Sequence, residues 1–353
     1  MTLKNLIISL IVLVTLAGCQ GKQTTENTPQ TKDQFAKVIN YLESTGDFIN
    51  SPAAPAVIDA KKVFAMLGTN MLVIDTRSEA EFNAGHIEGA VNVGFNNLIY
   101  FFENSIDPTA FDNITIACHT GQSAGFATSL LRMLGYKNTY SLKWGMSSWT
   151  KSVADTKWSK NIGSKYQDKL STEPTPKPEM GAYPQIYSTD TLGYAIVRKR
   201  AIEMLNNGFL HYAVKNDAVF EQPESFFIVN YWPEALYNKG HIPGAIQYTP
   251  KKSLSRTTFL QTLPTDKTIV PYCFTGQHSA YVTAYLAMLG YNAKSLLYGA
   301  NGIMHQLMVD DIGHHFSDAQ IMEYPLSTET NAKMPKVKQD KTQQPAPSAA
   351  GGC

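Results

Sequence analysis

The feature that most constrains this chain is an internal repeat. The segment at 84–90 (AGHIEGA) returns at 239–245 (KGHIPGA), and the segment at 118–122 (CHTGQ) returns at 273–277 (CFTGQ). The offset is 155 positions for both pairs. A register held between two separated motifs indicates duplication of one structural unit. The sequence therefore predicts two copies of the same domain.

Each copy carries the same order of expected elements. The pattern predicts a helix, a short apolar strand, a second apolar strand that ends at a cysteine, and a further helix. In the first copy these elements are expected at 59–67, 71–74, 114–117 and 124–134, and in the second at 195–205, 226–229, 268–272 and 279–289. Strands that alternate with helices favour an α/β fold with a parallel sheet. In such sheets the functional loops lie at the carboxyl ends of the strands.

Both repeated cysteines, Cys118 and Cys273, are expected at such a strand end. Gly121 and Gly276 follow three residues later and permit a tight curl of the backbone. The curl would point backbone N–H groups inward, and the next helix would add its positive N-terminal end. This environment favours a thiolate, which is the nucleophilic form of cysteine. The alternative is a buried structural cysteine.

In combination, four motifs resemble a rhodanese domain: Asp75-Thr76-Arg77, Glu81-Phe82, the segment 85–90 and the Cys118 loop. The resemblance covers 56–153 and 190–313. It implies two tandem rhodanese-like domains, each a parallel sheet flanked by helices. It also implies transfer or carriage of a sulfane sulfur through a cysteine persulfide. The donor would be thiosulfate or polysulfide, and the acceptor a thiol, on a small molecule or a protein, or cyanide.

The resemblance places catalysis on Cys118 and Cys273. The expected active-site loops are His119, Thr120, Gly121, Gln122, Ser123 and Ala124, and Phe274, Thr275, Gly276, Gln277, His278 and Ser279. Supporting residues are Asp75, Arg77, His86 and His241, of which the two histidines are expected to be hydrogen-bonded structural residues. No metal and no cofactor are expected. The sixth residue after each cysteine is Ala124 or Ser279 instead of the arginine of related phosphatases, so phosphatase activity is not expected.

The second copy departs from the first at three polar positions. Asp75, Arg77 and Glu81 become Asn230, Trp232 and Leu236. We infer that Arg77 and Glu81 form an ion pair that an apolar contact replaces in the second copy. Either His119 or His278 would raise the local positive potential, or both are exposed loop histidines. Since neither loop contains Lys or Arg, a non-catalytic rhodanese-like binding module is the alternative function.

The N-terminus indicates an exported lipoprotein. An apolar run at 6–16 is too short to span a bilayer but suits a signal peptide. Leu16-Ala17-Gly18-Cys19 resembles a lipobox, which implies cleavage before Cys19 and its lipidation. The alternative is an ordinary secretory signal. The chain is expected to be anchored to the cell envelope, facing the periplasm or the exterior. Gln20 favours the outer membrane in a Gram-negative cell.

The remaining sequence sets the expected domain limits and partners. A net charge of +1 indicates no nucleic-acid partner. Cys353 ends a polar tail and is either an accessory thiol that accepts a persulfide or an idle thiol. The expected organisation is a signal peptide at 1–18, a tether and N-terminal segment at 19–52, a first domain at 53–155, a linker at 156–189, a second domain at 190–318 and a flexible tail at 319–353.

Overall fold

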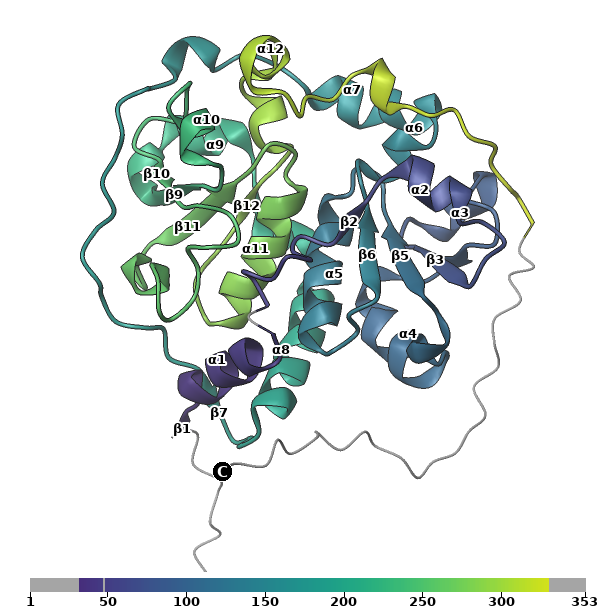
Figure 1. The fold of residues 1–353 in the computed structure, drawn as a ribbon, viewed down its shortest axis with the longest axis horizontal. Coiled ribbons are helices and arrows are strands. Elements are labelled where there is room, and N and C mark those ends of the chain that lie inside the picture. The colour runs from purple at the N-terminus through teal and green to yellow at the C-terminus, as the bar shows by residue number, and fades with distance from the viewer. Residues whose placement is uncertain (1–31, 47, 330–353) are drawn as a thin grey trace, which may run out of the picture.

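The first domain is built on a five-stranded parallel sheet, as a computed structural model that describes residues 32–46 and 48–329 shows (Figure 1). The strand order is β2-β6-β5-β3-β4. The strands are β2 (Val57–Ile58), β3 (Met71–Asp75), β4 (Val91–Asn92), β5 (Asn113–Ala117) and β6 (Thr139–Leu142). Every residue of the central strand β5 is buried, because helices cover both faces of the sheet.

Helices surround this sheet. They are α2 (Ala60–Ala65), α3 (Glu79–Ala84), α4 (Leu98–Asn104) and α5 (Gln122–Met133). Ser78 begins α3 through a capping box with Glu81. Gly121, in a left-handed conformation, directly precedes α5, which is buried along most of its length.

The second domain repeats this arrangement with shorter strands. Its strands are β8 (Ala213–Val214), β9 (Phe226–Asn230), β10 (Ile246–Gln247), β11 (Thr268–Tyr272) and β12 (Ser295–Leu296). They form the parallel orders β10-β9-β11 and β12-β8. Its helices are α8 (Gly193–Asn207), α9 (Asn216–Glu221), α10 (Glu234–Tyr237) and α11 (Gln277–Met288). The expected fold class, two α/β domains with parallel sheets, is confirmed.

The expected pairing of the first helices in the two copies is wrong. The counterpart of α2 at the repeat offset is α9, whereas the expected helix at 195–205 is α8. The counterpart of α8 is α1 (Phe35–Ser44), in the expected N-terminal segment. Helices α1 and α8 pack against each other, and β1 (Lys32–Asp33) pairs with β7 (Tyr187–Ser188). The duplicated unit therefore begins earlier than the repeated motifs suggested.

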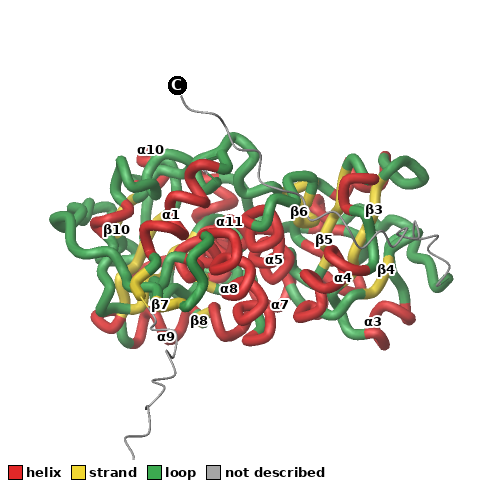
Figure 2. Tube along the Cα trace, turned by 90° about the horizontal axis from the view of Figure 1, so that it is seen from below, coloured by secondary structure: helices red, strands yellow, loops and turns green. Residues whose placement is uncertain are grey.

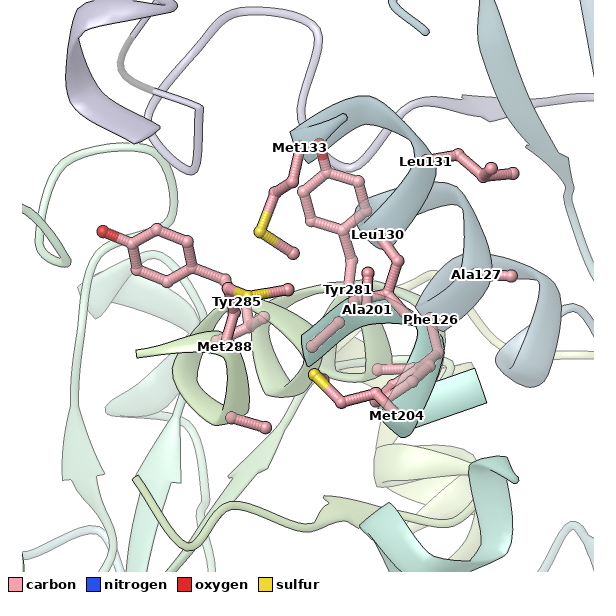
Figure 3. Packing of buried hydrophobic residues seen from close by; sticks show 14 of the residues in the cluster. Phe126, Ala127, Leu130, Leu131, Met133, Ala201, Met204, Tyr281, Tyr285 and Met288 are labelled. Carbon is pink, nitrogen blue, oxygen red and sulfur yellow. The ribbon is translucent and has the colours of Figure 1, made fainter. Parts of the chain in front are cut away.

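The two domains meet through the helices that follow the cysteine loops. Helices α5 and α11 pack against each other between the two sheets, and α8 lies beside them (Figures 1 and 2). One hydrophobic cluster runs across this junction (Figure 3). Ser129 Oγ also donates a hydrogen bond across it to the carbonyl of Tyr281, at 2.9 Å. Because both helices are buried nearly all round, they are core elements instead of surface helices.

The segment after each domain crosses to the other domain. Beyond α6 (Lys151–Thr156) and α7 (Trp158–Asn161), the chain runs along the outer edge of the second domain, where Ser171 pairs with His241 (Figure 1). Beyond α12 (His305–Leu307) and a π-helix (Met308–Ile312), the chain returns over the first domain, where Ser327 pairs with His86.

These contacts add to one expectation and correct another. The linker expected at 156–189 binds the second domain through backbone hydrogen bonds. The tail expected from 319 is bound to the first domain up to the last described residue, 329, because Met322 and Tyr324 pack on its core. Within the described part of the chain, no helix has the length and apolar character needed to cross a bilayer. The signal peptide at 1–18, Cys19 and Cys353 lie outside the described residues.

Candidate active site

The two cysteines occupy equivalent places in the two domains. Cys118 follows β5, the central strand of its sheet, and Cys273 follows β11, which pairs with β9, so each lies at the carboxyl end of a parallel strand. Both are free thiols, and both are buried, with 3% and 2% of their surface exposed. The loops that follow them lead into α5 and α11, so each sulfur lies at the N-terminal end of a buried helix.

Backbone N–H groups point at each sulfur. Gly121 N and Ala124 N donate to Cys118 Sγ at 3.1 and 3.4 Å. Cys273 Sγ accepts from Ser279 N at 3.3 Å, and its thiol donates to Ser279 Oγ at 3.6 Å. Such donors stabilise a negative charge on sulfur, whether thiolate or persulfide. The first loop directs two backbone donors at its sulfur, whereas the second directs one, and its thiol donates to the Ser279 hydroxyl.

A turn of the same domain binds the backbone carbonyls of each cysteine loop. Met146 N and Ser147 N donate to the carbonyls of Cys118 and His119, at 2.7 and 3.1 Å. In the second domain, Ala300 N and Asn301 N bind the carbonyls of Cys273 and Phe274 in the same way. The approach is so close that a side chain at Gly145 or Gly299 would overlap the cysteine carbonyl. The turns therefore determine where each loop lies.

The first residue of each supporting turn is strained. Trp144 and Tyr298 have φ of +63° and +61°, a left-handed conformation that bulky residues rarely adopt. Residues in such regions cost about 1–3 kcal/mol and persist only where the surroundings hold them.

The charged residues of the first domain pair differently from the expectation. Arg77 does not pair with Glu81. Its guanidinium binds the Asp75 carboxylate through two nitrogens, at 3.0 and 2.6 Å, and also donates to the carbonyl of Gly85 at 2.8 Å. Arg77 and Asp75 are both buried, so each needs a buried partner of opposite charge.

Glu81 instead reaches into the cysteine loop. Its Oε1 lies 2.6 Å from His119 Nε2, and its Oε2 accepts from the Ser78 hydroxyl at 2.6 Å. Partial burial acts to raise the pKa of Glu81, but the hydrogen bonds from Ser78 and His119 and the charge of His119 lower it from 4.5 to about 2. The Glu81 carboxylate therefore stays ionised over the whole physiological pH range, and it holds His119, the residue next to Cys118, in place.

The second domain replaces this ionic network with aromatic rings. Trp232 stacks on Phe274 at 4.8 Å between ring centroids, and Phe274 stacks on His314 at 4.4 Å. Phe274 is the counterpart of His119. The expectation that His278 is exposed is wrong: its Nε2 is enclosed without a hydrogen-bond partner, and burial, followed by the charge of Lys251, lowers its pKa to about 3. A neutral His278 adds no positive charge to the Cys273 loop.

His86 and His241 serve as anchors for the crossing segments. Both are fully buried. Each ring bonds to a carbonyl in its own domain, and its Nε2 lies 3.1 Å from the carbonyl of Glu329 or Glu173. Among the described hydrogen bonds, neither histidine contacts a cysteine sulfur. Both histidines therefore belong to a structural network.

Aromatic side chains from both domains cover the space between the two loops. Trp144, Trp158, Tyr298 and Phe316 form one cluster, with Trp158 at its centre. Trp158 Nε1 donates to the carbonyl of Thr120 in the Cys118 loop, at 3.2 Å. Burial, and to a smaller extent the neighbouring Cys118, raises the pKa of Tyr298, so this residue of the second domain lies near the thiol of the first.

Lysines, absent from both loops, line a nearby cavity. It has a volume of about 390 Å³ and extends from Lys61 and Lys62 to Lys143 and Trp144. Lys143 also forms an ion pair with Asp59 at 3.2 Å. The cavity thus brings positive charge next to the turn that supports the Cys118 loop.

Sequence reasoning missed the crossing segments, although a signal for them exists. Leu170-Ser171-Thr172-Glu173 follows the first domain, and the same four residues recur at 326–329 after the second. Each copy binds the histidine of the opposite domain. Trp158 and Phe316, which complete the aromatic cluster, lie in these same segments, outside the motifs that carried the resemblance.

Comparison with known proteins agrees with the duplicated architecture. A family model described as a rhodanese-like domain matches residues 59–152 and 220–305, together just over half of the chain. The chain is 35% identical over 78 residues to the thiosulfate sulfurtransferase GlpE of Shewanella oneidensis, a match that covers 22% of this chain and 73% of that protein. It is 31% identical over 115 residues to a tRNA uridine(34) hydroxylase of Prochlorococcus marinus, which covers 31% of this chain. The match spans only 34% of the hydroxylase.

Solved structures with similarity to this chain include two sulfurtransferases. A thiosulfate sulfurtransferase from Pseudomonas aeruginosa is 16% identical, with a TM-score of 0.28, and the match covers 85% of this chain and 50% of that one. SseA from Escherichia coli, described with the 3-mercaptopyruvate sulfotransferases, is 18% identical, with a TM-score of 0.26, over 69% of this chain and 98% of that one.

Proposed function

Because the chain belongs to the family of proteins with rhodanese-like domains, we propose that it transfers or carries sulfane sulfur through persulfides on Cys118 and Cys273. The observation that carries the proposal is that backbone N–H groups are directed at each sulfur at a strand end, two at Cys118 and one at Cys273. The same donors that stabilise a thiolate also stabilise the persulfide anion that replaces it. Of the two thiols, Cys118 is ranked first, because its sulfur faces two backbone donors and Glu81 holds His119 of its loop.

The reaction has two steps. The cysteine thiolate attacks the sulfane sulfur of thiosulfate, the S–S bond of the donor breaks, and sulfite leaves with the bonding electron pair. The enzyme then carries a persulfide anion. An acceptor thiolate, on a small molecule or a protein, or cyanide attacks the terminal sulfur and releases the cysteine thiolate, in a ping-pong cycle. Polysulfide serves as donor in the same way, with a shorter polysulfide leaving.

An anionic donor requires positive charge near the site. The loops contain no Lys or Arg, but the cavity beside Trp144 is lined by Lys61, Lys62 and Lys143. These lysines would concentrate thiosulfate or polysulfide next to the Cys118 loop through charge attraction. No cofactor and no metal take part in this chemistry.

The test is mass spectrometry of the intact chain from residue 20 onward, reduced and then incubated with thiosulfate or polysulfide. A gain of about 32 Da that an acceptor thiol removes is expected for persulfide formation. Cys118→Ser and Cys273→Ser variants identify the loading thiol. A Cys353→Ser variant tests whether the terminal cysteine accepts the sulfur, in which case its removal slows turnover with thiol acceptors.

A non-catalytic binding module is the second candidate, because a specific observation favours it. Both sulfur atoms are almost fully buried, and an aromatic cluster covers the loops. In this case no donor adds mass to the reduced, folded protein, and Cys→Ser variants keep their partner. Absence of any mass gain would therefore reject sulfur transfer in favour of this function.

The proposed location is the cell envelope, with the chain anchored by lipid on Cys19 and facing the periplasm or the exterior, at the outer membrane in a Gram-negative cell. The support is the lipobox-like sequence at 16–19. A Cys19→Ala variant, or treatment with globomycin, should leave an unprocessed precursor or release the protein from membranes. Unchanged processing would contradict the proposed anchor.

A further inference from the structure

One glutamine reaches from each cysteine loop into the opposite domain. Gln122 and Gln277 directly follow Gly121 and Gly276, and both are 2% exposed. A side chain on either glycine would overlap the amide of the opposite glutamine. The two loops are therefore in direct contact, with each glutamine lying over the glycine of the other loop.

Gln277 holds the turn that supports the Cys118 loop. Its Oε1 accepts from Trp144 N at 2.8 Å, and its Nε2 donates to the carbonyl of Leu142 at 3.1 Å. Two residues after Trp144, Met146 N donates to the carbonyl of Cys118. A short path of hydrogen bonds thus runs from a side chain of the second domain to the catalytic loop of the first.

Gln122 forms the reciprocal path. Its Oε1 accepts from Tyr298 N at 2.8 Å, and two residues later Ala300 N donates to the carbonyl of Cys273. Its Nε2 differs from that of Gln277, because it bonds to Thr120 Oγ1 within its own loop, at 3.1 Å. Both glutamines accept through Oε1 from a turn N–H of the opposite domain. The Nε2 of Gln277 donates into the opposite domain, whereas that of Gln122 donates within its own loop.

Both paths act on the strained residue of a turn. Trp144 and Tyr298 adopt left-handed conformations that require an external hold, and the backbone N–H of each is bonded by a glutamine of the other domain. If the glutamine is removed, a buried N–H loses its partner, and the turn is free to relax. Relaxation would shift the cysteine carbonyl and, with it, the N–H groups aligned on the sulfur.

We propose that Gln122 and Gln277 are reciprocal positioning residues, each of which sets the geometry of the other domain's cysteine loop and makes the two thiols one coupled site. The positioning itself is independent of the sulfur chemistry. Only its consequence for persulfide loading rests on the proposed function. The effect crosses between the domains: substitution of the glutamine in one domain changes the reactivity of the cysteine in the other.

The test is the rate at which iodoacetamide alkylates each cysteine of the full chain, followed by peptide mass spectrometry. Gln277→Ala should lower the rate at Cys118 by about fivefold, the ratio that corresponds to one lost hydrogen bond, and leave Cys273 close to its wild-type rate. Gln122→Ala should give the opposite pattern. A change confined to the cysteine in the same domain as the substitution, or no change, would overturn the proposal. A rise at both thiols would also overturn it, because the glutamine would then only close the interface.

A second pair of variants separates positioning from folding. Gln122→Glu keeps an acceptor for Tyr298 N, and the Thr120 hydroxyl can donate to the new carboxylate, so the rate at Cys273 should recover. Gln277→Glu places a carboxylate oxygen against the carbonyl of Leu142, so the rate at Cys118 should stay low. Equal behaviour of the two Glu variants would contradict the assigned contacts. If the crossed alkylation pattern is found but no donor loads a persulfide, the positioning stands and the proposed function fails.

Discussion

At the scale of single residues, equivalent positions in the two domains carry ion pairs in the first and aromatic stacking in the second. The first domain contains the ion pair Arg77–Asp75 and holds its loop through Glu81–His119, and the second stacks Trp232 on Phe274. The sequence predicted that an ion pair was exchanged for an apolar contact, but it assigned the wrong partners. The joint replacement of Arg77 and Glu81 in the second copy suggested that they pair, whereas the buried guanidinium binds Asp75. The partner of Glu81 is 38 positions away, which no local pattern reveals.

The Glu81–His119 pair predicts a pH dependence of stability. The pKa of Glu81 is lowered to about 2 in the folded state, so the unfolded state binds more protons between about pH 2 and its ordinary value of 4.5. The stabilisation is present above pH 4.5 and is lost as the pH falls towards 2. In urea unfolding, Glu81→Gln should be less stable than wild type at pH 6, and this difference should shrink on acidification. Glu79→Gln, on the exposed face of the same helix, is the control and should not change the slope; a matching change there would refute the assignment.

At the scale of elements, the longer helices and central strands lie within two residues of their expected positions. Their apolar patterns are strong because they are buried on several sides. The two-residue strands β2, β4, β8, β10 and β12 could not be predicted, because a strand that short has no measurable periodicity. They exist because a neighbouring strand offers hydrogen bonds, which is a tertiary effect.

The contact between α5 and α11 yields a prediction for Gly125. A Cβ at this position would lie 2.9 Å from the carbonyl oxygen of Gln277, a backbone atom that cannot move aside alone. Gly125→Ala should therefore separate the two helices and destabilise the protein by about 1–3 kcal/mol, despite the better helix propensity of alanine. Gly163→Ala, where no atom lies within 4 Å, is the matched control. Thermal unfolding measures both, and equal melting temperatures would show that the interface has room for the methyl group.

At the scale of the whole molecule, the two domains are joined by more than a linker. Helices α5, α8 and α11 form one shared core, and the segment after each domain binds the other. The Leu-Ser-Thr-Glu segments at 170–173 and 326–329 pair with His241 and His86 of the opposite domains. The chain therefore connects its two halves twice. A division into independent domains and flexible connections does not describe this molecule.

Deletion of 319–353 tests this interlocking. The deletion removes the backbone pair between Ser327 and His86 and the acceptor of Trp149 Nε1, the carbonyl of Pro325. Loss of partners for these groups should destabilise the protein by about 2 kcal/mol or more. Hydrogen exchange should show the first domain opening before the second, although the deletion lies beyond the second. Deletion of 330–353 keeps every described contact and is the control; equal effects of the two deletions would contradict the assigned contacts.

The sequence by itself determined the duplication, the α/β class and the place of each cysteine at a strand end, because these depend on local pattern and on repeated motifs. It also identified the loop residues, including Gln122 and Gln277, without their roles. Only the tertiary structure decided that these glutamines serve the opposite loop, that His119 pairs with Glu81, and that the connecting segments cross. Each of these depends on contacts between residues far apart in the chain, whose geometry is set by how α5 packs on α11.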